Sequence, residues 1–388
     1  MKIGLIRGAY LSQFEMQTCE HLLGRVDLEA YHVNINRFPT NIIKVPIKHL
    51  RCIDDPFTCI SPKLGFYFNL FLQATNGLDY WHYGLEKMLA GKDIAHTYET
   101  FNAFSWQALQ AKKKYGTKLV VTSWENRPYA AERFAAKRRM KYEVLQGTDL
   151  FLAITPRAAR CLELEGADPA KIRVLPYGIN TERFQPRAKP ADWQQKLGLK
   201  PDDFVIVSVA ALRWEKGVFD ILHAFKSLTL SRPGRALKLI FAGSGPEADR
   251  LKDLAARIGL ADRVVFTRFP YDQMHAAYNV ADVFVLGSTA RPGWLEQFGY
   301  VLPEAMASGT PVISTLHGSI AEVVGDCGIL VPPSDFIGLA GAMQRLLDSP
   351  AEREHFARIG RARAVAEFDS ARQAERLLEA YESLMPKK

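Results

Sequence analysis

Two glutamates, Glu296 and Glu304, stand eight positions apart in the stretch EQFGYVLPEAMASGTP. Pro303 suits the first turn of a helix, and Gly309 suits the residue that follows its end. We therefore expect the residues between the glutamates to enter a helix N-terminus, where free N–H groups and the helix dipole favour phosphate. Carboxylates on either side can accept hydrogen bonds from hydroxyls. The pattern predicts a site for a nucleotide sugar, although an acid in a first turn also stabilises a helix without any ligand.

Cations near a diphosphate would offset the charge of the two carboxylates. Arg213 and Lys216 follow the apolar run FVIVSVAAL directly, in the segment RWEKG. A guanidinium binds phosphate oxygens as a fork, and an ammonium binds them as a point charge. The sequence contains no Asp-x-Asp element. We therefore expect a diphosphate to be bound without a metal ion, and we expect no other cofactor.

Short apolar runs alternate with helical patterns along the whole chain, as in KIGLI, KLVVTSW, FVIVSVAAL and LKLIFAG. Such runs are typical of strands that are buried on both faces of a parallel sheet. The alternation occurs twice over, which predicts an α/β protein with two doubly wound domains. Ligands of such sheets bind beyond the carboxyl ends of the strands, so the side chains that follow the strands are the candidates for chemistry.

The boundary between the two domains is expected in the polar segment 184–203, which contains three prolines. We place the first domain at 1–187 and the second at 188–368. An amphipathic helix is expected at 369–385, where it could cap either domain.

Charge is distributed unevenly along the chain. Residues 1–190 carry 27 Lys and Arg against 18 Asp and Glu, whereas the remainder carries 23 against 24. Long-range attraction of anions therefore belongs to the first half. Apart from Cys52 and Cys59, the five cysteines show no metal-type spacing. The first residues do not look like a signal peptide, and no apolar run reaches the roughly 18 residues of a membrane span. These features predict a cytoplasmic protein with reduced thiols.

The runs EQFGYVLPEAMASGTPVIST and GSIAEVVGDCGILVPPSD resemble the signature of retaining glycosyltransferases of family 4. The segments EKG, FAGSGPEADRLKDLA and RVVF are similar to other blocks of that family's second domain, and IRVLPYGINTERFQP is similar to the end of its first. The resemblance covers about residues 149–335. It implies the GT-B fold, in which two Rossmann-like domains face each other across a cleft. The first domain would bind the acceptor and the second the nucleotide sugar.

The resemblance also implies roles for individual residues. Glu304 would hold the ribose, and Glu296 would act on the transferred sugar as a catalytic residue. The donor's diphosphate and sugar would contact Arg213, Lys216, Phe298, Gly299 and Tyr300. The anomeric configuration would be retained through an oxocarbenium-like transition state, and the enzyme would contribute charge stabilisation and positioning.

The chain departs from the family pattern in two places. Ala210 and Ala211 stand where the family has Gly-Arg, and Arg213 is the candidate to replace that guanidinium. In the run VVTSWEN, Trp124 stands where the family has a histidine. We expect Trp124 to stack on an acceptor sugar and Glu125 to orient or deprotonate an acceptor hydroxyl.

Three further features have a functional and a structural interpretation. Gly8, at the end of the first strand, would let the backbone approach the donor, although a turn there also asks for glycine. The basic segment 132–145 is expected to form a positively charged helix face, either solvated or attracted to an anionic membrane. The aromatic segment 64–73 is predicted as a core helix, with an acceptor groove or a lipid contact as the alternative. His96, on a buried strand, is expected to be structural.

Together these features predict a retaining, metal-independent glycosyltransferase of the hexosyltransferase type. It would move a sugar from a UDP-sugar, or alternatively a GDP-sugar, to a saccharide or a lipid-linked saccharide in polysaccharide biosynthesis. It would work in the cytoplasm, with peripheral contact to the inner face of the membrane as a further hypothesis. The alternatives are an NAD-dependent oxidoreductase, a GT-B phosphorylase and a non-catalytic two-lobed sugar-binding protein. No G-x-G-x-x-G motif follows the first strand, and no nucleic-acid-binding module is recognisable.

Overall fold

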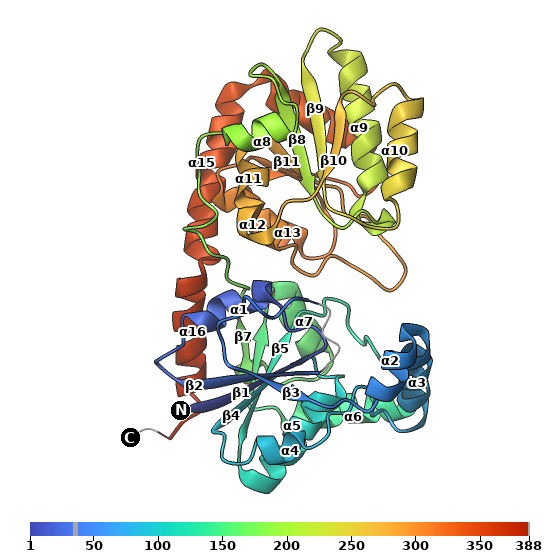
Figure 1. The fold of residues 1–388 in the computed structure, drawn as a ribbon. Helices are drawn as coiled ribbons and strands as arrows, with labels where there is room; N and C mark the ends of the chain where they lie inside the picture. The colour runs from blue at the N-terminus through green and yellow to red at the C-terminus, as the bar shows by residue number, and fades with distance from the viewer. Residues whose placement is uncertain (34–37, 387–388) are drawn as a thin grey trace. The chain divides into compact units, whose positions relative to one another are not determined.

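The structure is a computed structural model that describes residues 1–33 and 38–386, and it divides into two compact units (Figure 1). The first unit comprises Met1–Gly178 and Ser370–Lys388, and the second comprises Ile179–Asp369. The segment 184–203 belongs to the second unit. Phe184 packs edge-on against Tyr278, with ring centroids 5.8 Å apart, and Trp193 packs against Phe269 at 4.0 Å.

The first unit contains a parallel sheet in the order β3-β2-β1-β4-β5-β6-β7. The strand order reverses between β1 and β4, which makes their carboxyl ends a topological switch point, the usual place for a ligand. The sequence pattern did not predict β2 and β3, because charged and polar residues interrupt both. The strands are β1 (Lys2–Gly8), β2 (Asp27–Val33), β3 (Ile47–Leu50), β4 (Ile94–Tyr98), β5 (Lys118–Ser123), β6 (Leu150–Ala153) and β7 (Ile172–Val174).

Helices cover both faces of this sheet (Figure 1). One face packs against α4, α5, α6 and α7, and the other against α1 and the C-terminal helix α16. The helices of the unit are α1 (Gln13–Glu20), α2 (Asp55–Ile60), α3 (Pro62–Thr75), α4 (Leu85–Met88), α5 (Ala103–Tyr115), α6 (Ala135–Gly147), α7 (Pro156–Leu164) and α16 (Ser370–Glu382).

His96 joins α16 to the sheet. Its ring nitrogens lie 2.6 Å from the hydroxyl of Tyr381 on α16 and 2.7 Å from Oγ1 of Thr122 on β5. Burial lowers the pKa of His96 to about 3. The neutral ring therefore serves as a hydrogen-bonding spacer in the core, which confirms its expected structural role.

One expectation for the first unit is wrong, and another holds only in part because Arg133, Arg138 and Arg139 are exposed but two lysines are not. Segment 64–73 is not a core helix, because most large apolar side chains of α3 are exposed. The basic segment 132–145 does not present all its cations to solvent. Lys137 is buried against Asp79, and Lys141 is buried with its Nζ 2.7 Å from Glu165 and 2.9 Å from Glu132. A buried ammonium needs such partners, and the fold brings two of them, Asp79 and Glu165, from other segments of the chain.

The second unit contains a parallel sheet in the order β10-β9-β8-β11-β12-β13. Its switch point lies between β8 and β11. The apolar runs predicted every strand of this sheet except β13, which begins at a glycine. The strands are β8 (Phe204–Val209), β9 (Leu237–Ala242), β10 (Val264–Thr267), β11 (Val283–Leu286), β12 (Val312–Thr315) and β13 (Gly328–Val331).

The predicted apolar face of α9 is buried against this sheet, as the helical spacing of Val218, Ile221, Leu222, Phe225 and Leu228 required. Among the described residues, no helix combines the length and hydropathy that a membrane span requires. The helices of the unit are α8 (Ala191–Lys196), α9 (Val218–Ser231), α10 (Ala248–Arg257), α11 (Met274–Asn279), α12 (Val301–Ala307), α13 (Ile320–Val324), α14 (Phe336–Asp348) and α15 (Pro350–Glu367).

Candidate active site

The carboxylate of Glu296 lies where the two strands at the switch point of the second unit end. Lys216, in the turn after β8, places its Nζ 2.7 Å from Oε2 of Glu296. Ser288, just after β11, donates its Oγ to the same oxygen at 2.6 Å. Glu296 is buried. The structure thus brings together Glu296 and Lys216, which the sequence singled out, and adds Ser288, which its place after an apolar strand could have indicated.

The turn that carries Lys216 touches the end of β11 through the backbone. Gly217 has φ +62°, and a Cβ atom there would lie 1.7 Å from the carbonyl oxygen of Gly287. Only glycine allows this approach. The Nζ of Lys216 also lies 4.8 Å from the centroid of the Trp294 ring, a cation–π contact that adds to its ion pair with Glu296.

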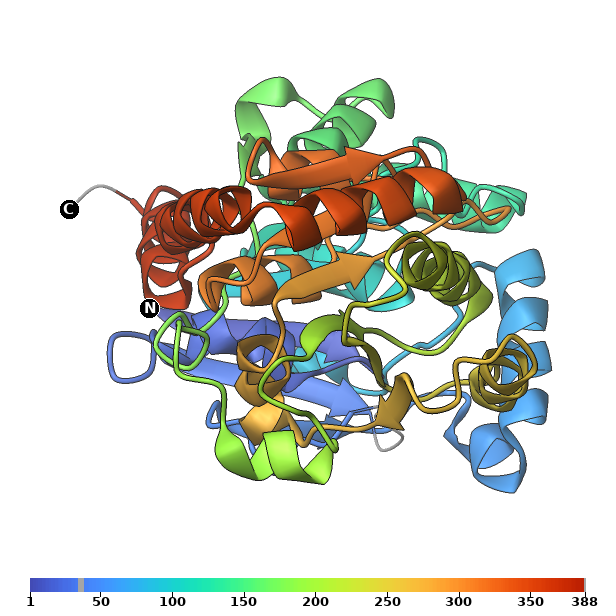
Figure 2. The same ribbon diagram turned by 90° about the horizontal axis from the view of Figure 1, so that it is seen from above.

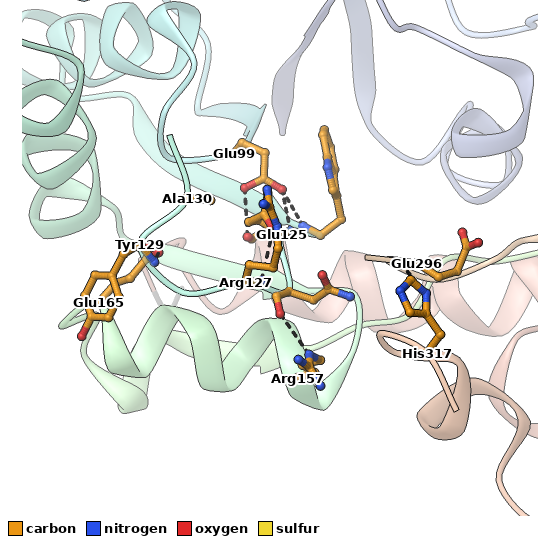
Figure 3. A network of polar contacts seen from close by, with 12 residues as sticks. Glu99, Glu125, Arg127, Tyr129, Ala130, Arg157, Glu165, Glu296 and His317 are labelled. Atoms are coloured by element: carbon orange, nitrogen blue, oxygen red, sulfur yellow. Dashed lines mark hydrogen bonds and ion pairs between the residues drawn. The ribbon is translucent and has the colours of Figure 1, made fainter. Parts of the chain in front are cut away.

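The loop after β12 holds the backbone of Glu296. The N–H of Glu296 donates to Nδ1 of His317 at 3.3 Å, and its carbonyl accepts from the N–H of Ser319 at 2.9 Å (Figure 3). Between them, Gly318 has φ +60°, and a Cβ atom there would lie 2.1 Å from the carbonyl oxygen of Glu296. His317, Gly318 and Ser319 therefore fix the backbone position of Glu296.

Glu304, on α12, is also buried. The hydroxyl of Tyr278 on α11 donates to its Oε2 at 2.6 Å, while its Oε1 has no hydrogen-bond partner among the described residues. Burial raises the pKa of Glu304 to about 7, although the Tyr278 hydrogen bond and the positive charge of Arg183 act in the opposite direction. One oxygen of this carboxyl group is thus left to accept a hydrogen bond from a ligand.

The turn Phe298, Gly299 and Tyr300 leads into α12, which begins at Val301. Phe298 is buried, and its ring packs edge-on against those of Tyr300 at 5.5 Å and Phe368 at 5.7 Å. Gly299 has φ +74°, a left-handed conformation that suits glycine. The ring of Phe298 therefore anchors the turn, and any contact of this residue with a phosphate falls to its backbone.

Arg213 is oriented toward a different partner from Lys216. Its Nε lies 2.8 Å from Oε1 of Glu215, which Arg291 also approaches at 3.3 Å. Its side chain is half exposed. The expected contact of Arg213 with a diphosphate stays a prediction. For that contact, the guanidinium would have to leave Glu215 or bind the Glu215 carboxylate and the phosphate together.

A second cluster lies at the carboxyl ends of β1, β4 and β5 in the first unit. Gly8 has φ +63°, and a Cβ atom there would lie 3.0 Å from the ring of Phe104. The guanidinium of Arg7 lies 4.2 Å from the centroid of Trp124 and 4.7 Å from that of Tyr98. One face of the Trp124 ring is therefore occupied, and the predicted stacking on an acceptor sugar would use the other.

Glu125 lies in an ion pair with a close neighbour in the chain. Its Oε1 accepts from Nε of Arg127 at 3.0 Å and from the N–H of the same residue at 3.1 Å, and its Oε2 lies 3.2 Å from Nη2. Its role toward an acceptor hydroxyl stays a prediction. It would require the hydroxyl to compete with Arg127 for the carboxylate.

Glu99, which the sequence analysis did not single out, holds this loop through hydrogen bonds (Figure 3). It is buried directly after β4, with φ +62°, an uncommon conformation for a non-glycine residue. Its Oε1 accepts the N–H groups of Trp124 at 2.7 Å and Glu125 at 2.9 Å, and its Oε2 accepts Oγ of Ser123 at 3.1 Å. Burial, together with the charge of Glu125, raises the pKa of Glu99 to about 8. The sequence feature that could have identified Glu99 is its position directly after an apolar strand.

Among the described residues, no group of His, Cys, Asp and Glu side chains has the arrangement of a metal site. All five cysteines are free thiols.

Comparison with known proteins connects these clusters to a family. Residues 190–363 match the family model of glycosyl transferases group 1, and residues 56–183 match that of glycosyltransferase family 4. A D-inositol 3-phosphate glycosyltransferase of Nocardia farcinica is 34% identical over 256 residues, which are 63% of this chain and 54% of that protein. A glycogen synthase of Mycobacterium tuberculosis is 34% identical over 216 residues, 53% and 47% of the two chains. The chain thus spans about half the length of these relatives.

Solved structures resemble the whole chain. HepE of Anabaena, in complex with UDP, superimposes with a TM-score of 0.78 at 18% identity and covers 99% of this chain and 100% of its own. The sucrose-phosphate synthase of Thermosynechococcus elongatus has a TM-score of 0.73 at 21% identity, with 99% of each chain covered. The two family models together match most of both units, and the expected fold is confirmed. The chain belongs to the glycosyltransferases of family 4 and has the GT-B fold.

Proposed function

We propose that this chain is a retaining glycosyltransferase that moves a hexose from a UDP-sugar to an acceptor hydroxyl of a saccharide or a lipid-linked saccharide. The observation that carries the proposal is the convergence of Lys216 and Ser288 on Glu296. These side chains come from the turns after β8 and β11, which flank the switch point of the second sheet. A cation and a fixed carboxylate at that position suit a diphosphate bound next to a polyol.

The donor would use each of these groups differently. The unpartnered Oε1 of Glu304 would accept a hydrogen bond from a ribose hydroxyl, and Glu296 would contact the transferred sugar. The ammonium of Lys216 and the backbone of the turn before α12 would receive the diphosphate. The choice of UDP is supported by relatives, since HepE has been solved with UDP and with UDP-glucose.

The reaction would proceed with little covalent participation of the protein. The bond between the anomeric carbon and the phosphate oxygen breaks, and a bond to the acceptor oxygen forms on the same face of the sugar. The acceptor's proton passes to the leaving diphosphate or to Glu125. The protein would contribute electrostatic stabilisation of the departing diphosphate, chiefly through Lys216, and positioning of the two reactants. In the first unit, Gly8, Trp124 and Glu125 would serve substrate binding at the ends of β1 and β5.

A thermal-shift panel of UDP, GDP, ADP and NAD tests the donor class. A ligand present at 100 times its Kd adds about 2.7 kcal/mol to the free energy of unfolding. We expect UDP to stabilise the protein most, and stabilisation by NAD alone would contradict the proposal. Transfer of sugar from a UDP-sugar should continue in EDTA. Loss of transfer in EDTA, with recovery on addition of a divalent metal, would refute metal independence. The cytoplasmic location expected from the sequence stays a prediction.

A further inference from the structure

Helix α3 has the opposite amphipathicity to that of an ordinary surface helix. The residues that it buries are Gly65, Asn69 and Leu72, of which only one is a large apolar side chain. Asn69 donates to Oδ2 of Asp54 at 2.8 Å and to the carbonyl of Gly65 at 3.0 Å, and accepts the N–H of Tyr80 at 3.0 Å. Polar and small side chains thus attach the helix to its unit.

The large apolar side chains of α2 and α3 point outward instead. Figures 1 and 2 show both helices at the periphery of the first unit. We call this set of exposed side chains the apolar hairpin surface: Phe57 (38% exposed), Ile60 (76%), Leu64 (47%), Phe66 (60%), Tyr67 (64%) and Phe71 (60%). Single exposed apolar residues need no explanation, but six on two consecutive helices mark a surface that is covered in use.

The charges around the apolar hairpin surface identify its partner. Residues 56–78 contain one charged side chain, Lys63, which is exposed. The carboxylates at either end are used internally: Asp54 accepts from Asn69, and Asp79 pairs with Lys137. Helix α6, which packs against α3, exposes Arg138 and Arg139.

Net charge points the same way. The first unit carries 28 Lys and Arg against 20 Asp and Glu, and the second carries 22 against 22, so the entire net charge of +8 resides in the unit with the apolar hairpin surface. Two copies meeting at this surface would bring two such units together, and their charges would repel. An anionic bilayer would attract the same charge, and its interface accepts Phe and Tyr side chains readily.

We propose that α2 and α3 insert their outward aromatic and aliphatic side chains into the interface of an anionic lipid bilayer, with Lys63 and the exposed arginines of α6 at the headgroups. Aromatic and aliphatic side chains on one face with cations beside them are the features of an interfacial helix. The proposal concerns attachment, not catalysis, and it deepens the proposed function by placing the enzyme where a lipid-linked acceptor is found.

Vesicle flotation of the full chain tests this proposal. The probes are vesicles of phosphatidylcholine alone and vesicles of equal parts phosphatidylcholine and phosphatidylglycerol. The test variant is Phe66→Ser with Phe71→Ser. The matched control is Leu230→Ser with Ile337→Ser, which removes from the second unit two apolar side chains that are slightly more exposed (68% and 67%) than the two phenylalanines (60% each). Because all four side chains are exposed, neither variant should change the thermal midpoint.

We expect the wild type and the control to float with the anionic vesicles and to bind neutral ones much more weakly. The test variant should bind anionic vesicles about tenfold less tightly, while UDP stabilises it as it does the wild type. That last measurement separates failure of this proposal from failure of the proposed function. Equal flotation of test variant and wild type would overturn the proposal, as would a wild type that binds neither vesicle. A dimer in sedimentation equilibrium that the test variant dissociates would overturn it in favour of a second copy.

Discussion

Substitution of Glu304 by glutamine should change stability and ligand affinity in opposite directions. Glutamine has the shape of the protonated carboxyl group, and its carbonyl oxygen can still accept the hydrogen bond from Tyr278. It removes the buried charge, and with it the charged acceptor that a ribose hydroxyl would use. A residue with a purely structural role would affect UDP binding only through stability.

The size of both effects follows from the pKa of Glu304, which burial raises from 4.5 to about 7. The stabilisation that this group contributes is full below its unfolded pKa and is lost as pH rises through about 7. Above that pH, keeping the buried charge costs on the order of 3 kcal/mol. Glu304→Gln avoids this cost, so its free energy of unfolding at about pH 8 should exceed that of the wild type by up to this amount.

Affinity for UDP should behave in the opposite way. If only ionised Glu304 accepts the ribose hydroxyl, about one tenth of the protein is competent at pH 6 and about nine tenths at pH 8, so the apparent Kd falls about tenfold across this range. In the variant, the carbonyl is used by Tyr278, and the NH2 group that faces the ribose can only donate to its hydroxyl. Such a neutral hydrogen bond is weaker than one to a charged acceptor by about 1 kcal/mol. We therefore expect Glu304→Gln to bind UDP several-fold more weakly at pH 8.

Isothermal titration of UDP between pH 6 and pH 8 measures these affinities, and urea unfolding at the same pH values measures stability. The phosphate of UDP also titrates near this range, with a pKa of about 6 for phosphate monoesters. The variant, which lacks the carboxyl group, reports that contribution by itself. A variant that binds UDP as tightly as the wild type, with the same slope against pH, would refute the role of Glu304 at the ribose.

Three further substitutions probe the two clusters. Lys216→Ala should lower sugar transfer and UDP affinity by about tenfold or more, because it removes the cation expected at the diphosphate and the positive charge beside Glu296. Steady-state kinetics measures this, with Lys216→Arg as the conservative comparison. Equal kinetic constants for the wild type and both variants would exclude a role of Lys216 at the diphosphate. Gly318→Ala should lower the free energy of unfolding in urea by at least about 1–2 kcal/mol, since its φ of +60° and a Cβ contact of 2.1 Å both oppose alanine. Gly341→Ala, in a helix with open space around it, should instead raise that free energy by about 0.5–1 kcal/mol. Equal effects of the two substitutions would contradict the geometry around Gly318. Glu99→Ala should cost about 1–3 kcal/mol or more, because two partly buried N–H groups lose their acceptor. Glu99→Gln should keep that acceptor and unfold less readily than the wild type above pH 8. Identical pH profiles of the wild type and Glu99→Gln would show that no buried charge is present.

Local patterns in the chain were enough to predict several parts of the fold and site. Runs of apolar residues predicted most strands, because a strand that is buried on both faces of a sheet consists almost entirely of apolar residues and is easily recognised. Pro303 indicated the first turn of α12, which begins at Val301, and Gly309 indicated its end, since φ preferences act within a few residues. The pattern failed at β2, where DLEAYHV mixes charged and apolar residues and pairing with β1 supplies the stability instead.

Contacts between distant residues depended on packing that no window of sequence contains. Lys216 and Glu296 are 80 positions apart, and their contact exists only because β8 pairs with β11. Glu99 reaches the loop after β5 because β4 and β5 are neighbours.

Burial depended on tertiary structure in the same way. Lys141 looks like a solvated residue in its helix, yet Glu132 and Glu165 converge on it, and Phe66 looks like a core residue, yet it points to solvent. The residue types determined which strands and turns form, since those preferences are local. The strand order determined which charges meet and which face of each helix is buried, because those energies arise between segments that only the folded chain brings together.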